Sequence, residues 1–200
     1  MLPLSLPTVS PVSVKLVCLV ELVLVRAVTH FVFNSTLHNE DMFLIRRYVE
    51  HDLDAVVTLW YRSWINAFPN LKHPQPFEEW KLRFQNDLAK RGSIWVAEAQ
   101  GRIAGFIVVI EAKRILEQIF VDVNPQGMGI GTALLNKAKT ICPSGLSLTT
   151  LRQNVQACKF YEKHDFVARR LGVNPINGQP NIEYIWNPKV EAKRNQKNVM

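Results

Sequence analysis

The residues that point most directly to chemistry lie in NPQGMGIGTALLNKAK, residues 124–139. Gly127, Gly129 and Gly131 alternate there, directly before an apolar pattern with helical spacing. Glycine tolerates positive φ and lets a ligand approach the main chain closely. The first N–H groups of a helix have no partner within the helix, and the helix dipole adds positive potential. The stretch therefore predicts an anion site, with phosphate as the favoured anion.

Two common phosphate loops do not fit this stretch. A P-loop needs Gly-Lys followed by Ser or Thr, and no such run is present. The dinucleotide-binding fingerprint needs a glycine at the position of Thr132. One further interpretation stays open, which is a glycine-rich turn that only lets a strand and a helix pack closely.

The elements that must position this loop alternate along the chain. Apolar periodicity predicts helices over 53–64, 77–88, 130–138 and 154–163, with Asp52 as the cap of the first. Strands are expected over 43–48, 94–98, 102–109, 115–121, 146–151, 166–171 and 182–186, with a hairpin at Gln100-Gly101. This order predicts a mixed α/β domain with one sheet covered on both faces.

Two motifs in this order of elements resemble those of a known family. Gln126, Gly129 and Gly131 form Q-x-x-G-x-G, and LTTLRQNVQACKFYEKHDF follows at residues 148–166. Both resemble signatures of the GNAT superfamily of N-acetyltransferases, and the resemblance covers about residues 44–186. Asp165 stands where the family usually has glycine, at a position after a helix where a left-handed conformation is common. Aspartate tolerates that conformation better than most residues.

The resemblance implies a mostly antiparallel central sheet of about six to seven strands with helices on both faces. It also implies transfer of an acetyl group from acetyl-CoA to a primary amine by direct transfer. The backbone of Ile119, Phe120 and Val121 would pair with the pantetheine arm. The pyrophosphate would be held by Gln126, Gly127, Met128, Gly129, Ile130, Gly131 and Thr132. Asn154 would cap the following helix, touch the cofactor, or do both.

Catalysis would fall to two residues by the same resemblance. Tyr161, in FYEK, would protonate the departing thiolate, because a tyrosine is protonated at neutral pH. The alternative is a tyrosine that only packs against the sheet. Glu117, on the strand before the loop, would act as a general base through water. The alternative for Glu117 is a carboxylate on a solvated or salt-bridged face.

The sequence gives weaker indications of the residues that bind the acceptor amine. Trp60, Trp64, Phe68 and His73 are the candidates for binding the amine, although aromatic residues at helical spacing also build cores. The segment NGQPNIEYIW, with Asn181, Glu183 and Tyr184, is a further candidate wall. Loops carry no readable code for a substrate, so the acceptor stays open between a small molecule and a protein.

Composition and charge exclude some classes of function. The formal charge of +7 suits nucleic acid or a phosphate-rich small molecule. No zinc spacing and no signature of DNA or RNA binding is present, which favours the small molecule and predicts neither a metal nor a nucleic-acid partner. An acyl-CoA-binding module without turnover is the alternative function. The oligomeric state stays open between a monomer and a homodimer.

The ends of the chain differ from its middle. Residues 1–41 are apolar and rich in valine but include Lys15, Glu21 and Arg26, which makes a poor membrane span. We expect a dispensable extension over 1–41, a catalytic domain over 42–187 and a polar basic tail over 188–200. Three cysteines without metal spacing argue for a reducing compartment and a cytoplasmic location, without a membrane partner.

Overall fold

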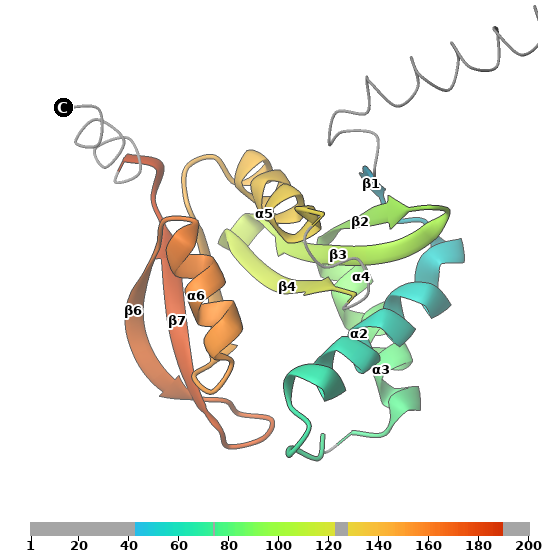
Figure 1. Ribbon diagram of the computed structural model, residues 1–200, viewed down its shortest axis with the longest axis horizontal. Helices are drawn as coiled ribbons and strands as arrows, with labels where there is room; N and C mark the ends of the chain where they lie inside the picture. Colours follow the sequence, from blue (N-terminus) through green and yellow to red (C-terminus); the bar gives the residue numbers. More distant parts are fainter. Residues whose placement is uncertain (1–42, 74, 123–127, 190–200) are drawn as a thin grey trace, which may run out of the picture. The chain divides into compact units, whose positions relative to one another are not determined.

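The computed structural model describes residues 43–73, 75–122 and 128–189 (Figure 1). The strands are β1 (Leu44–Arg47), β2 (Ser93–Ala99), β3 (Arg102–Ile110), β4 (Ile115–Val121), β5 (Leu146–Leu151), β6 (Phe166–Val173) and β7 (Pro180–Trp186). The helices are α2 (Leu53–Ala67), α3 (Phe77–Arg83), α4 (Ala89–Arg91), α5 (Ile130–Ile141) and α6 (Val155–Lys163), with short turns η2 (Glu50–Asp52), η3 (Phe84–Leu88) and η4 (Glu111–Lys113). The predicted order of elements is confirmed.

All seven strands belong to one sheet, in the order β1-β2-β3-β4-β5-β7-β6. Every neighbouring pair is antiparallel except β4 and β5, which run parallel. That parallel pair is in register only at Ile115 and Ser147. The two strands therefore separate after their first residues, and in Figure 1 β4 runs across the view while β7 stands upright beyond it.

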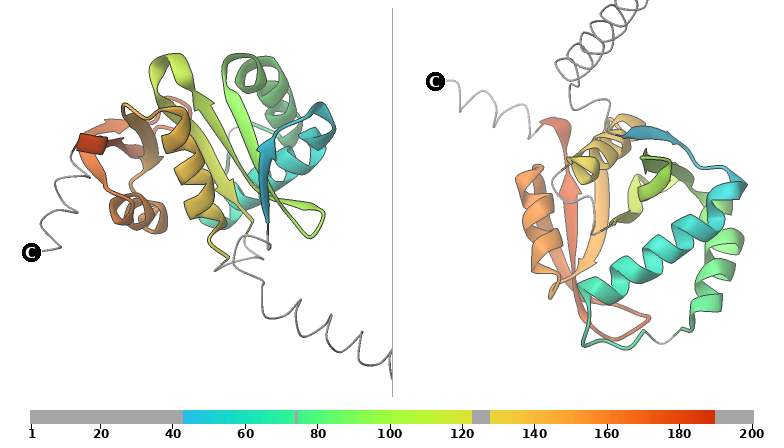
Figure 2. Two further views of the ribbon diagram at one scale, coloured as in Figure 1. Left: turned by 90° about the horizontal axis from the view of Figure 1, so that it is seen from above. Right: turned by 45° about the vertical axis from the view of Figure 1, so that its right-hand side comes forward.

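Helices cover both faces of the sheet, as the sequence predicts. Along β3, Phe106 and Val108 join the core under α2 and α3, whereas Ile107 and Val109 join the core under α5 and α6. Figure 2 shows α5 on one side of the sheet and α2 on the other. All four of these side chains are fully buried, and each such burial contributes about 1.5–3 kcal/mol.

Two turns follow directly from their residue types. Gln100 and Gly101 have φ of 51° and 71°, so they form the predicted hairpin between β2 and β3. Asp165, after α6, has a φ of 65°, which confirms the left-handed position expected there. Aspartate is one of the few residues apart from glycine that adopts this conformation readily.

The predicted cap at Asp52 was wrong, and the predicted helix over 77–88 is present with an irregular turn. The Asp52 side chain does not cap α2. It accepts hydrogen bonds from the Arg46 guanidinium at 2.7 and 2.8 Å and from the Val49 N–H at 2.9 Å, because a partner on β1 lies within its reach. The helix expected over 77–88 is also not uniform, since a π-helical turn, η3, separates α3 from α4. Periodicity alone does not reveal an extra residue in a helical turn.

Candidate active site

A cavity of about 880 Å³ opens where β4 and β5 separate. Strand β4 supplies the stretch from Leu116 to Val121, and β5 supplies the stretch from Leu148 to Leu151. The start of α5, the start of α6, α2, α3 and the β6–β7 loop complete the wall. Splayed parallel strands leave backbone and side chains facing an open space, which is where ligands commonly bind in α/β folds.

The start of α5 supplies backbone donors to this cavity. Gly129 precedes the helix with a φ of 77°, a conformation that explains glycine at this position. The Ala133 N–H bonds the Gly129 carbonyl at 3.0 Å, so the N–H groups of Ile130, Gly131 and Thr132 precede the first bond of the helix. A Cβ on Gly131 would make only ordinary contacts with the Phe160 ring, at 3.5 Å. Of the two loop glycines that the structure describes, Gly129 thus shows a backbone need for glycine and Gly131 does not.

Strand β4 pairs with β3 along one of its edges and carries one displaced residue. Ile119 lies opposite Ile107, and Val121 lies opposite Gly105. The register shifts between Val108 and Val109, so Glu117 is the extra residue of a β-bulge. A bulge re-aims a side chain and interrupts the alternation of the strand. Glu117 lines the cavity together with its neighbours on β4.

Glu117 is also part of an ion-pair network. The Arg91 guanidinium donates to Glu117 Oε1 at 3.1 Å and pairs with Asp87. About a quarter of the Glu117 side chain is exposed. The two interpretations of Glu117 are therefore compatible, because it is a salt-bridged carboxylate in the cavity wall.

Tyr161 lies in the cavity wall from α6. Its side chain is 7% exposed, and burial raises the pKa of its hydroxyl well above the ordinary value of 10.0. No hydrogen bond of this hydroxyl is found among the described residues. Tyr184, with its ring 5.9 Å away, differs because its hydroxyl donates to Glu162 at 2.8 Å. Of the two tyrosines, only Tyr161 combines a lining position with an uncommitted donor.

Two side-chain contacts fix the starts of α5 and α6. The Ala157 N–H donates to Asn154 Oδ1 at 3.1 Å, which confirms Asn154 as the cap of α6. Thr132 Oγ1 lies 3.1 Å from His164 Nε2, while His164 Nδ1 lies 2.7 Å from the Phe160 carbonyl. The carbonyl can only accept, so His164 carries a proton on Nδ1. Thr132 and His164 thereby connect the first turn of α5 to the end of α6.

The four predicted acceptor residues gather at the opposite part of the cavity. Trp60, Trp64 and Phe68 are buried at 3%, 8% and 8% exposure and belong to the core under α2, yet all three line the cavity. The His73 ring packs at 4.8 Å from Trp64 and 4.4 Å from Trp80. Burial lowers the pKa of His73, which keeps its imidazole neutral at neutral pH. Trp60, Trp64 and Phe68 therefore belong to the hydrophobic core and also form part of the cavity surface.

Several predicted positions fall elsewhere. Gln126 and Gly127 lie outside the described residues. Met128 packs against the core under α5 rather than lining the cavity. Within the candidate wall NGQPNIEYIW, Asn177 lines the cavity, whereas Asn181, Glu183 and Tyr184 lie in the β7 ladder and are not among the lining residues. The β6–β7 loop also contributes Asn174 and Ile176.

Sequence reasoning missed three contributors. Arg83 on α3 lines the cavity, and Arg91 on α4 binds Glu117. Ser63 Oγ donates to the Val121 carbonyl at 3.3 Å and so ties α2 to the end of β4. No local signal marks them, since each is an ordinary polar position on an amphipathic helix.

Neither a metal-binding group nor a membrane-spanning helix is found among the described residues. Within them, no group of three or more His, Cys, Asp or Glu side chains could hold a metal ion. None of their helices has the length and apolar character needed to cross a bilayer.

Comparison with known proteins agrees with this arrangement. The model of the Acetyltransferase (GNAT) family matches residues 53–166. The peptidyl-lysine N-acetyltransferase YjaB of Salmonella typhimurium is 30% identical over 141 residues, which is 70% of this chain and 93% of that protein. The matched region runs from the start of α2 to the start of β6 and so contains both motifs.

Solved structures share the fold. A GCN5-related N-acetyltransferase of Rhodopseudomonas palustris gives a TM-score of 0.61 at 18% identity, over 72% of this chain and 94% of that one. The PaiA N-acetyltransferase of Thermoplasma acidophilum, in complex with coenzyme A, gives 0.57 at 20% identity, over 72% and 98%. These likenesses establish the architecture, while the sequence match establishes the relationship. The chain therefore belongs to the acetyltransferase (GNAT) family, and it is an acetyltransferase.

Proposed function

We propose that this enzyme moves an acetyl group from acetyl-CoA to a primary amine of a small molecule or protein by direct transfer. The observation that carries the proposal is one cavity that joins the α5 N-terminus, the free edge of β4 and the Tyr161 hydroxyl. Two likenesses support it. The PaiA structure holds coenzyme A, and YjaB acts on peptidyl-lysine, which is a primary amine.

The donor half would bind along β4 and the start of α5. The N–H groups of Ile130, Gly131 and Thr132 suit a pyrophosphate, because helix N-termini favour anions. The edge of β4 that β5 leaves open, at Ile119, Phe120 and Val121, suits the amide-rich pantetheine arm. Gln126, Gly127 and Met128 remain part of this proposed loop.

Bound acetyl-CoA supplies the thioester. Tyr161 would stabilise the charge that develops on sulfur as the amine attacks the carbonyl. A thiol has an ordinary pKa of about 8.5, so the buried Tyr161 is the weaker acid of the two. Its main contribution would be a hydrogen bond to the developing thiolate. The second proton that the amine nitrogen loses, as the amide forms and the thioester C–S bond breaks, would then convert the thiolate to the free thiol.

The amine must be neutral before it can attack. Glu117, which lines the cavity at the bulge of β4, would accept the proton of the ammonium form through water. Its ion pair with Arg91 occupies Oε1, which leaves Oε2 as the candidate acceptor.

The direct test measures thiol release from acetyl-CoA across a panel of primary amines, with mass analysis of the products. Turnover that depends on an amine, with an added acetyl group in the product, is expected. Tight coenzyme A binding without turnover on any amine would instead favour a binding module. A cytoplasmic location and the absence of a nucleic-acid partner remain predictions, the second tested by salt-dependent retention on DNA.

A further inference from the structure

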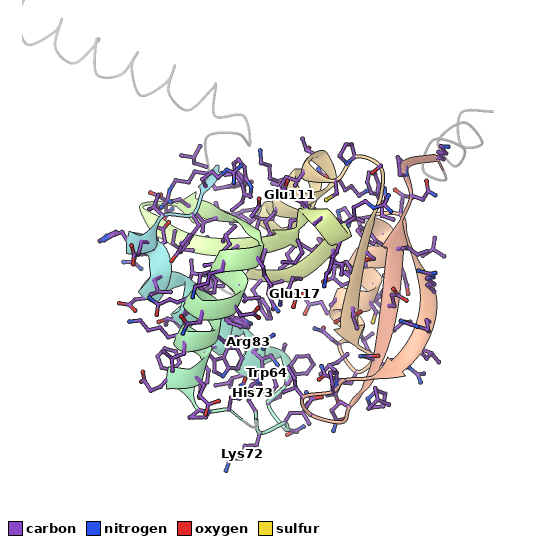
Figure 3. The ribbon with its side chains drawn as sticks, turned by 180° about the vertical axis from the view of Figure 1, so that it is seen from behind. Trp64, Lys72, His73, Arg83, Glu111 and Glu117 are labelled. Carbon is purple, nitrogen blue, oxygen red and sulfur yellow. The ribbon has the colours of Figure 1, made fainter. Side chains whose placement is uncertain are left out.

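Arg83 has an unusual position for an arginine in this cavity. It lies at the end of α3, half-buried, and its guanidinium carbon stands 5.5 Å from the centre of the Trp60 ring. Packing over an aromatic ring restrains an arginine and removes part of its hydration. In Figure 3, Arg83 lies below Glu117 and above Trp64 and His73. It therefore belongs to the part of the cavity predicted to receive the amine.

Two carboxylates near Arg83, those of Asp87 and Glu117, are already engaged. Asp87, one turn further along, is held by Arg91 through both of its oxygens, the second at 3.0 Å. Glu117 is held by the same Arg91 at 3.1 Å. The π-helical turn η3 lies between Arg83 and Arg91, and such turns occur often at functional sites. Among residues 43–73, 75–122 and 128–189, no ion pair of Arg83 is found.

A half-buried guanidinium without a carboxylate partner is suited to an anion from outside the protein. Its planar donors match the two oxygens of a carboxylate. Asp122, the other acidic residue of the cavity wall, follows Val121 at the far end of β4, where its N–H donates to the Ala104 carbonyl at 2.8 Å. An amine that carries an anionic group would thus bind beside Arg83, between Glu117 and the aromatic side chains of Trp60 and Trp64.

The geometry points to an acceptor amine that also carries a carboxylate, held by Arg83, with its apolar part against Trp60 and Trp64. This inference rests on the proposed function, since it specifies the acceptor of the same reaction. Glu117 would lie toward the amine and Arg83 toward the carboxylate, so the two charges of an amino-acid-like molecule would meet opposite charges. The neutral His73 adds a hydrogen-bonding group without repelling either end.

The test compares amino acids with their carboxamides, which keep the amine and side chain but lack the charge. The ratio of kcat/KM between each acid and its carboxamide is expected to be about 10 to 100 in the wild type, the range of one charge-assisted bond. Arg83→Gln should bring the ratio close to one, and Arg83→Lys should restore part of it. Arg62→Gln, at an exposed arginine of α2, is the matched control and should keep the wild-type ratio.

Other outcomes separate the inference from the proposed function. Efficient acetylation of carboxamides or of lysine in a blocked peptide, with a ratio near one, overturns the inference and leaves the acetyltransfer intact. A raised KM for acetyl-CoA in Arg83→Gln, with the ratio unchanged, would assign Arg83 to the donor and also overturn it. If no amine is acetylated, calorimetry of the coenzyme A-loaded protein with the same ligand pairs decides the question. Equal binding of acids and carboxamides would then count against Arg83 as their site.

Discussion

Arg91 on α4 donates a hydrogen bond of 3.1 Å to Glu117 at the bulge of β4. The contact joins residues 26 positions apart and connects the α3–α4 region to the proposed base. Because the bulge displaces Glu117 and Arg91 restrains it, the carboxylate has a defined place in the cavity wall.

Replacing Glu117 by Gln should lower kcat by roughly 10² to 10⁴, the range typical of a general base. The KM for acetyl-CoA should stay within about twofold, because the proposed donor contacts lie further along β4 and at α5. Arg91→Met should lower kcat less, since the carboxylate remains but loses its restraint. Steady-state kinetics at saturating amine measures both. An unchanged kcat in Glu117→Gln would leave Glu117 with only its structural role.

Tyr161→Phe should lower turnover by roughly 10² to 10³, the usual loss when one hydrogen-bond donor to a developing charge is removed, while the affinity for coenzyme A changes little. The pKa of Tyr161 is raised by burial, so the acid form persists above pH 10. The wild-type rate should consequently show no decline assignable to Tyr161 between pH 8 and about pH 10. Tyr184→Phe is the control, because it removes a hydroxyl bound to Glu162 outside the cavity lining. Equal losses in the two variants would argue against a catalytic role for Tyr161.

Gly129→Val should weaken acetyl-CoA binding by at least about tenfold, because a branched side chain disfavours the positive φ that presents the α5 N–H groups. Gly101→Val provides a matched control. Gly101 has a φ of 71° against 77° at Gly129, and a Cβ at either position would meet nothing within 4 Å. The two variants should lose similar stability by urea denaturation. Calorimetric titration with coenzyme A should separate them, and equal affinities would contradict a phosphate site at Gly129.

The Arg46–Asp52 pair should contribute to stability in a pH-dependent way. Asp52 is 5% exposed, and the Arg46 guanidinium lowers the pKa of that carboxyl, with help from the Val49 N–H. A lowered pKa in the folded state means that the contribution is present above the unfolded value of about 3.9 and disappears as the pH falls below it. Urea denaturation between pH 7 and 3 should show this loss in the wild type and a smaller one in Asp52→Asn.

Removing the cation of this pair tests the same contact. Arg46→Met should cost about 2 kcal/mol at pH 7, because it leaves a buried charged group short of a partner. Lys81→Met is the comparison, since Lys81 pairs with Asp54 at 2.6 Å but the Asp54 side chain is 80% exposed. An exposed pair contributes at most about 1 kcal/mol. Equal losses of unfolding free energy in Arg46→Met and Lys81→Met would mean that burial does not determine how much these ion pairs stabilise the protein.

Residues 1–41 should be dispensable. All the strands and helices that line the cavity lie between β1 and β7, within Leu44–Trp186. Deleting residues 1–41 should therefore leave the melting temperature, coenzyme A affinity and turnover of the remaining chain unchanged. A loss of any of these, measured on the shortened protein beside the full chain, would assign the segment a function.

Sequence alone determined the local features of this protein. Periodicity gave the order of strands and helices, since burial of one face imposes a period on apolar residues. Residue type predicted the turn at Gln100-Gly101, the left-handed Asp165 and the capping by Asn154, all of which depend on neighbours within a few positions. The glycine stretch and the FYEK segment predicted where acetyltransfer chemistry would lie.

Only the tertiary structure decided how distant residues meet. The separation of β4 from β5 and the bulge at Glu117 depend on pairing between strands, which a single strand's pattern does not encode. The Asp52 carboxylate accepts hydrogen bonds from Arg46 instead of capping α2, because a charge-assisted pair with a guanidinium is a strong interaction. Arg83 and Arg91 look alike in the sequence. The fold gives one of them two carboxylates and leaves the other facing the cavity, because ion pairing depends on positions in space.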